Sequence, residues 1–174
     1  GPGECQLRVM CVGLNFRDVL NVLGMYPGDP GDPGGDCSGV VAKVGSADSR
    51  LSVGLPAFGL AIGSLGTHVN VVEDLMVPMP PGVSFDAAAT APTVFVTVEL
   101  AYRQAAGLRS GERVLVHAAT GGVGLAATQV VTAAGADVYA TAGSSYKRAL
   151  LRGMSVQDVA SSRDIRYVTE VGGL

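Results

Sequence analysis

The residues most able to do chemistry in this 174-residue chain lie where an apolar segment runs into a turn of small residues. Residues 113–117 (RVLVH) predict a short buried strand, and residues 121–134 predict an apolar helix. The junction reads Ala119-x-Gly121-x-x-Gly124, a dinucleotide-binding fingerprint with Ala119 in the place of its first glycine. Small residues let the backbone turn tightly, let a pyrophosphate approach Gly121 and let Gly124 bring the helix close to the strand. The N–H groups and positive end of that helix would then face the phosphates.

The segment after this helix indicates which dinucleotide would bind. Residues 137–141 predict a second strand, and an NAD site usually carries Asp or Glu about 20 residues after the fingerprint. Residues 139–148 contain no acid, but they contain several hydroxyl groups and the cations Lys147 and Arg148. Such groups can bind a 2′-phosphate through charge-assisted hydrogen bonds, so the sequence predicts NADPH rather than NADH. The alternatives are a solvated helix face for the two cations and a tight turn that binds no ligand.

The composition narrows the kinds of partner that the chain can have. Hydrophobic residues make up 48% and charged residues 16%, which is enough apolar material for a folded core. A net charge of −3, an aromatic content of 5% and the absence of Trp argue against a nucleic-acid partner. Because the sequence has no signal segment and no run of about 20 apolar residues, we expect no membrane span and a cytoplasmic location. The three cysteines have no paired spacing and are expected to be small buried thiols.

The elements that must position these groups fall into two parts with different periodicity. Short strands separated by glycines predict a small barrel or curled sheet in the first part: 5–12, 38–45, 56–60 and 66–72. A helix at 15–23 follows the first of them, and the proline-rich segment 73–92, where Ser84 can cap a helix, ends this part. We expect the boundary between residues 1–92 and 93–174. The second part alternates helix and strand as in a doubly wound parallel sheet, so the fold class is α/β. Its further expected elements are helices at 94–106 and 145–152 and a third strand at 156–160.

Several separate motifs, spread over nearly the whole chain, resemble one family. They are 13–20 (GLNFRDVL), 24–28 (GMYPG), 117–124 (HAATGGVG) and 160–163 (ASSR). The chain resembles the enoyl reductase domain of modular polyketide synthases, a zinc-free, quinone-reductase-like branch of the medium-chain dehydrogenase/reductase superfamily. The resemblance implies a GroES-like β-barrel catalytic region at 1–92 and a partial Rossmann domain at 93–174 that binds NADPH. Compared with the domain of this family, the chain is expected to be truncated.

The resemblance also implies an activity. Hydride would pass from NADPH to the β-carbon of an α,β-unsaturated acyl thioester, and a proton would follow at the α-carbon. The phosphopantetheine of an acyl carrier protein would carry this thioester, so that protein and neighbouring polyketide synthase domains are the expected partners. Two alternatives remain open: a quinone oxidoreductase of the same superfamily, and a truncated, non-catalytic module that binds NADPH or a partner.

The resemblance assigns roles to single residues. Asn15 is expected near the nicotinamide, with a helix cap as its alternative, and Thr97 is expected to line the cleft. The rest of the cofactor site is expected at Gly121, Gly122, Val123 and Gly124 (pyrophosphate), Ser144 and Lys147 (2′-phosphate), and Ser162 and Arg163 (adenosine ribose). Glu99 stands where many members of the family carry a Tyr linked to delivery of the α-proton. It is a candidate proton donor only if burial raises its pKa, and otherwise an ordinary glutamate at the cleft edge.

A metal is not expected. The zinc-dependent relatives carry a His in a Gly-His-Glu stretch, and the corresponding stretch here is Gly34-Gly35-Asp36. Gly35 cannot ligate a metal, and Asp36 with Cys37 does not supply the three protein ligands of a catalytic zinc. Without such a Lewis acid, hydrogen-bond donors would have to stabilise the oxygen of an enolate intermediate.

Overall fold

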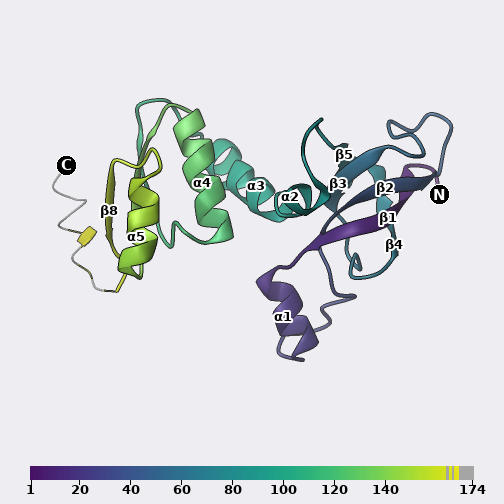
Figure 1. The fold of residues 1–174 in the computed structure, drawn as a ribbon, viewed down its shortest axis with the longest axis horizontal. Coiled ribbons are helices and arrows are strands. Elements are labelled where there is room, and N and C mark those ends of the chain that lie inside the picture. The colour runs from purple at the N-terminus through teal and green to yellow at the C-terminus, as the bar shows by residue number, and fades with distance from the viewer. Residues whose placement is uncertain (164, 166, 169–174) are drawn as a thin grey trace. The chain divides into compact units, whose positions relative to one another are not determined.

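The computed structural model describes residues 1–163, 165, 167 and 168, and the chain divides into two compact units, Gly1–Thr93 and Val94–Leu174 (Figure 1). The first unit contains a five-stranded antiparallel sheet with the order β4-β1-β2-β3-β5. Its strands are β1 (Glu4–Gly13), β2 (Asp36–Val44), β3 (Pro56–Leu60), β4 (His68–Val72) and β5 (Met76–Pro78). The four strands that the sequence predicts in this region are confirmed, and β5 is an addition.

Alternating side chains place one face of this sheet in a core. The pattern is clearest on β4, where Val69 and Val71 are buried and His68 and Asn70 are exposed. The core of this unit consists of Cys5, Leu7, Cys37, Val41, Leu51, Ala57, Ala61, Val69, Val71 and Met76. Two of the three cysteines therefore lie in the core as free thiols, and the third is half-buried.

The unpredicted strand β5 follows a 3-10 helix, Glu73–Leu75, and pairs with β3. Met76 anchors it, since this side chain is fully buried, while Val77 is 46% exposed. Pro78 is tolerated because an edge strand loses no ladder hydrogen bond when a backbone N–H is missing. A strand of three residues among prolines has too little periodicity to be recognised in a sequence.

The helices of the first unit are α1 (Phe16–Val22) and α2 (Phe85–Ala89), both of which the sequence predicts. Although apolar spacing predicts α1, Phe16 and Val22 are 75% and 74% exposed, and Asp18 is its buried residue. Helix α2 packs against β1 and β2. Ser84 is the N-cap residue of α2, as the sequence predicts, and has an extended backbone, but its side chain makes no cap hydrogen bond.

The second unit is a parallel sheet with the order β6-β7-β8, which confirms the predicted α/β alternation. Helix α3 (Pro92–Val98) begins with the last two residues of the first unit and continues into the second. The further elements of the second unit are a π-helix (Glu99–Ala105), β6 (Arg113–Val116), α4 (Gly122–Ala133), β7 (Asp137–Ala142), α5 (Ser145–Arg152) and β8 (Asp158–Ser161). The single helix predicted at 94–106 therefore changes its hydrogen-bond pattern midway. The third strand, expected at 156–160, is β8.

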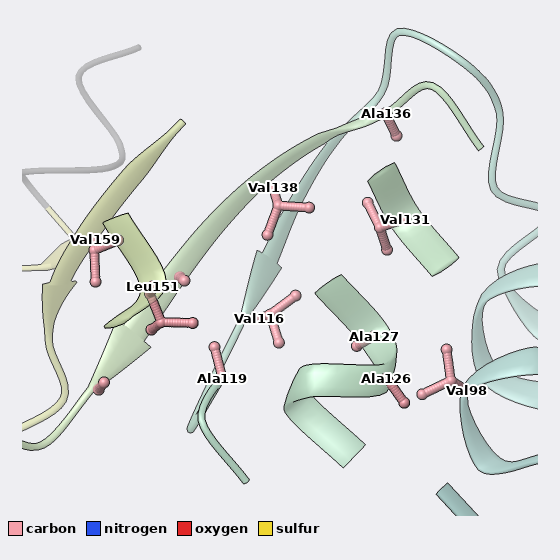
Figure 2. Packing of buried hydrophobic residues seen from close by; sticks show 12 residues of the cluster. Val98, Val116, Ala119, Ala126, Ala127, Val131, Ala136, Val138, Leu151 and Val159 are labelled. Carbon is pink, nitrogen blue, oxygen red and sulfur yellow. The ribbon is translucent and has the colours of Figure 1, made fainter. Parts of the chain in front are cut away.

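The core of this unit lies between its sheet and the helices that connect the strands. Figure 2 shows Val116 of β6 and Val138 of β7 pointing towards α4, and Leu151 of α5 beside Val159 of β8. All four side chains are at most 6% exposed. This packing fixes the carboxyl ends of β6 and β7, from which the turns described below emerge. Within the described residues, no helix is both long and apolar enough to cross a membrane.

Candidate functional site

The fingerprint turn connects β6 to α4 and is tied to the neighbouring strand. Ala118 adopts the left-handed conformation, with φ of 50°, and Ala119 is fully buried. The backbone N–H of Ala119 donates to the carbonyl oxygen of Thr141 at 3.0 Å, and that of Gly121 donates to the carbonyl oxygen of Ala118 at 2.8 Å. Gly121 is the N-cap residue of α4, so the first-turn N–H groups of that helix open beside the turn.

The glycines of the turn differ in how closely other atoms approach them. A Cβ on Gly124 would lie 2.6 Å from both the carbonyl oxygen of Ala118 and the Cα of Ala119, a distance that no side chain can occupy. This contact confirms that Gly124 is needed for close packing of the helix on the strand. A Cβ on Gly122 would lie 3.2 Å from a methyl group of Val94, so its constraint is weaker.

Two cavities open on the fingerprint turn, and both are lined by Ala118 and Gly121. The first has a volume of about 450 Å³ and is lined also by Thr97, Val98, Ala101, Tyr102, Val116, His117, Gly122, Val123, Gly124 and Ala127. The second has a volume of about 490 Å³ and is lined also by Thr120, Ala142, Gly143, Ser144, Lys147, Ser162 and Arg163. The structure therefore brings together all the candidate residues of the second unit except Glu99, in two groups that meet at one turn.

The part of the second cavity that the structure describes is cationic, because Lys147 and Arg163 line it and none of its described lining residues is acidic. The hydroxyl oxygen of Ser144 accepts from the N–H of Lys147 at 3.3 Å and so caps α5. The guanidinium of Arg163 lies against Gly143, where a Cβ would approach its Nε to 2.9 Å. Arg148 instead donates to the carbonyl oxygen of Ala142 at 3.2 Å and does not line the cavity. The cavity thus offers two cations and two serine hydroxyls to an anion.

The first cavity presents a different set of side chains, of which sequence reasoning identified only Thr97, Val123 and the glycines. The Nδ1 atom of His117 lies 3.1 Å from the hydroxyl oxygen of Thr141, which holds the imidazole in place. Burial raises the pKa of Tyr102, so its phenol is protonated at neutral pH. No sequence motif indicates Tyr102. It reaches the same cavity wall as Thr97 because of the way the helix runs between these two residues.

Glu99 does not line either cavity. Its carboxylate forms an ion pair with the Nε of Arg103 at 3.2 Å, and its side chain is 47% exposed. The burial on which its expected role as a proton donor depends is therefore missing.

In the first unit, Asn15 is held by two buried carboxylates. It is the N-cap residue of α1, and its backbone N–H donates to Oδ2 of Asp18 at 2.8 Å in a capping box. Its side-chain Nδ2 donates to Oδ2 of Asp36 at 2.9 Å. The capping role, which the sequence offers as an alternative, is thus present, and a role at the nicotinamide stays a prediction. The three-residue spacing from Asn15 to Asp18 could have revealed this capping box.

The residues of the Gly34-Gly35-Asp36-Cys37 stretch do not suit a metal. Among the described residues, no group of three or more His, Cys, Asp or Glu side chains could hold a metal ion. Cys37 is fully buried, and burial, together with the nearby Asp36 and Cys5, raises the pKa of its thiol to about 12. A protonated thiol is neither a metal ligand nor a nucleophile.

This combination defines a class of protein: a β-rich unit followed by a parallel α/β unit with a dinucleotide-type fingerprint turn. Residues 1–81 match the family described as the alcohol dehydrogenase GroES-like domain. The chain is 43% identical over 174 residues to the spectinabilin polyketide synthase system protein NorB of Streptomyces orinoci, a match that covers 99% of the chain and 8% of that protein.

Solved structures agree with this assignment. The CurK enoyl reductase matches with a TM-score of 0.92 and 34% identity, over 99% of this chain and 55% of that one. The quinone oxidoreductase from Thermus thermophilus, also solved in complex with NADPH, matches with a TM-score of 0.81 and 36% identity, over 98% of this chain and 55% of that one. The chain belongs to the medium-chain dehydrogenase/reductase superfamily, as its motifs predict. It spans about half the length of these two solved chains and under a tenth of the polyketide synthase protein.

Proposed function

We propose that this chain is an enoyl reductase of a polyketide synthase, which uses NADPH to reduce an α,β-unsaturated acyl thioester carried on an acyl carrier protein. The observation that carries the proposal is the pair of cavities that meet at Ala118 and Gly121. A dinucleotide has two nucleotide halves joined by a pyrophosphate, and this arrangement suits one half on each side of the turn. Similarity to the CurK enoyl reductase and to the polyketide synthase protein NorB supports the choice of substrate class.

The cofactor roles follow from the two cavities. The backbone of the fingerprint turn and the first turn of α4 bind the pyrophosphate, through Gly121, Gly122, Val123 and Gly124. Lys147 and Ser144 bind the 2′-phosphate, and Ser162 with Arg163 lies against the adenosine ribose. The charge of the second cavity favours NADPH over NADH, because a 2′-phosphate gains charge-assisted hydrogen bonds there that a ribose hydroxyl does not.

The first cavity then receives the nicotinamide half, with Thr97 on its wall. When bound, NADPH supplies the hydride that goes to the β-carbon of the thioester. The chain's own groups orient the ring, exclude water and hold hydrogen-bond donors, among them Thr97 and the protonated Tyr102 phenol. Asn15 belongs to this same end of the cofactor site in our proposal.

Loss of NADPH absorbance on addition of a crotonyl thioester, attached to a carrier protein or to free pantetheine, tests this function in the purified protein. We expect turnover that depends on the thioester. Similarity to the Thermus quinone oxidoreductase makes quinone reduction the second candidate, so a quinone is assayed in parallel. Turnover with quinones alone, or NADPH binding without turnover of either substrate, contradicts the proposal.

A further inference from the structure

Two buried carboxylates fix both nitrogen atoms of Asn15. Asp36 on β2 and Asp18 on α1 are only 2% and 6% exposed. Oδ2 of Asp36 accepts from the side-chain Nδ2 of Asn15 at 2.9 Å, and Oδ2 of Asp18 accepts from its backbone N–H at 2.8 Å. Two separate acids thus hold Asn15, Asp18 at its backbone and Asp36 at the tip of its half-buried side chain.

The second oxygen of each carboxylate binds a distant segment. Oδ1 of Asp18 accepts from the N–H of Gly34 at 2.8 Å. Oδ1 of Asp36 accepts from the N–H of Thr93 at 3.0 Å and from its hydroxyl at 2.7 Å. Each acid therefore connects Asn15 to a segment far along the sequence. Because both carboxylates are buried, each depends on these donors to offset its loss of hydration.

Two glycines beside these acids allow neighbouring segments to approach closely. A Cβ on Gly13 would lie 3.0 Å from the Cβ of Asp36 and would collide with the carbonyl oxygen of Ala89. A Cβ on Gly34 would lie 2.6 Å from the hydroxyl oxygen of Ser64, and Gly34 has a φ of +96° that favours glycine. Glycine at these two positions therefore lets the backbone of Ala89 and the side chain of Ser64 approach the segments that carry the network.

We infer that Asp36 is a positioning residue, which fixes the direction of the Asn15 amide by accepting one of its N–H bonds. The amide oxygen and the second N–H of Asn15 are then left for a ligand, and the orientation of the amide is set before the ligand binds. The Gly34-Gly35-Asp36 stretch lacks the metal ligand of the zinc-dependent relatives, and in this chain it orients Asn15 instead. The inference rests on the proposed function, in which Asn15 lies at the nicotinamide end. There a misplacement of about 1 Å lowers the rate of hydride transfer by roughly 100-fold.

A double-mutant cycle tests this coupling. Asp36→Asn keeps an acceptor for Thr93 but turns an amide NH₂ towards the Nδ2 of Asn15, so the amide loses its partner. We expect Asp36→Asn and Asn15→Ala each to slow single-turnover hydride transfer at least about tenfold. The rate of the double variant should lie within about twofold of the rate of Asn15→Ala, because Asp36 acts through Asn15. Rate losses that multiply in the double variant overturn the inference.

A matched control separates positioning from general loss of stability. Val71→Ala removes core volume on β4, away from this network, and lowers stability. We expect it to lower the melting temperature while leaving the hydride-transfer rate near that of the unmodified protein. If Asp36→Asn slows the rate no more than Val71→Ala does, Asp36 has no positioning role.

A second measurement does not require activity. The Nδ2 protons of Asn15 give an amide pair in the ¹⁵N spectrum, and Asp36→Asn should shift this pair and speed its exchange with water. An unchanged pair overturns the inference even if the enzyme is active. If Asp36→Asn shifts the signals of this amide pair but the unmodified protein turns over no thioester, the orienting contact is supported and only the proposed function is refuted. If Asp36→Asn does not fold, the exchange variant Asn15→Asp/Asp36→Asn restores the hydrogen bond in reverse, and failure of this exchange to restore folding also counts against the inference.

Discussion

The carbonyl oxygen of Thr141 accepts the backbone N–H of Ala119 at 3.0 Å, so the middle of the fingerprint turn is bonded to β7. The side chain of the same threonine reaches two further groups of the turn. Its hydroxyl oxygen lies 3.1 Å from Nδ1 of His117 and accepts from the N–H of Ala118 at 3.4 Å. Thr141 is fully buried, and it lies opposite the one non-glycine residue with positive φ among those described, Ala118. The turn is therefore shaped by its neighbouring strand as well as by its own glycines.

Thr141→Val should weaken cofactor binding while preserving the fold. Valine has nearly the same shape, but it leaves Nδ1 of His117 and the N–H of Ala118 without the hydroxyl. We expect the free energy of unfolding to fall by about 1–3 kcal/mol, as for other buried groups that lose a partner. Urea denaturation and NADPH titration measure the two effects. Thr141→Ser, which keeps the hydroxyl, should retain most of the NADPH affinity, and equal losses in both variants would contradict this explanation.

Gly124→Ala should be much more damaging than Gly122→Ala. The added Cβ at 124 would meet the backbone of Ala118 and Ala119 at 2.6 Å, so α4 must move away from the strand. At 122 it would meet only a methyl group of Val94 at 3.2 Å, and that side chain can shift. We expect Gly124→Ala to cost about 1–3 kcal/mol of stability and most of the NADPH affinity. Thermal denaturation of the two variants checks this, and similar melting temperatures would show that the close approach is unimportant.

Lys147→Ala should separate the two nicotinamide cofactors. Lys147 lines the cationic cavity, so its removal should raise the dissociation constant of NADPH by roughly 10- to 100-fold, which corresponds to a charge-assisted hydrogen bond. The dissociation constant of NADH should change little. Arg148→Ala is the matched control, because Arg148 binds the carbonyl oxygen of Ala142 and does not line the cavity. Fluorescence titration with both cofactors decides the matter, and an equal loss for NADPH and NADH would remove the argument for a 2′-phosphate site.

The elements around the fingerprint turn could be predicted because their signals are local. The apolar run of β6, the small residues of the turn and the helix that follows stand together in the sequence, and each has a direct physical reason. The same holds for the Asn15 cap, which depends on a residue three positions away. These parts of the site needed no knowledge of the tertiary structure.

The remaining features depend on contacts between distant segments. The bonds of Asp36 to Asn15 and Thr93 join residues 21 and 57 positions apart, so no periodicity reports them. Tyr102 reaches the first cavity through a π-helix, a local change in hydrogen bonding that the apolar pattern does not encode. The ion pair of Glu99 with Arg103 has a visible four-residue spacing, but spacing alone does not give the exposure that decides its chemistry.

The buried thiol of Cys37 should make stability fall at high pH. Its pKa in the folded chain is raised to about 12 from an ordinary value of 9.0, chiefly by burial. Folding therefore favours the protonated thiol, and this contribution is fully present below about pH 9 and is lost as the pH rises towards 12. Within this window the free energy of unfolding should drop by up to about 1.4 kcal/mol per pH unit for this one proton. Cys37→Ala should make the decline less steep by that amount, whereas Val41→Ala, at a buried residue of the same core that has no titratable proton, should not. Denaturant unfolding between about pH 8 and 11 measures the slopes, and identical slopes in all three proteins would show that the Cys37 thiol does not titrate differently in the folded chain.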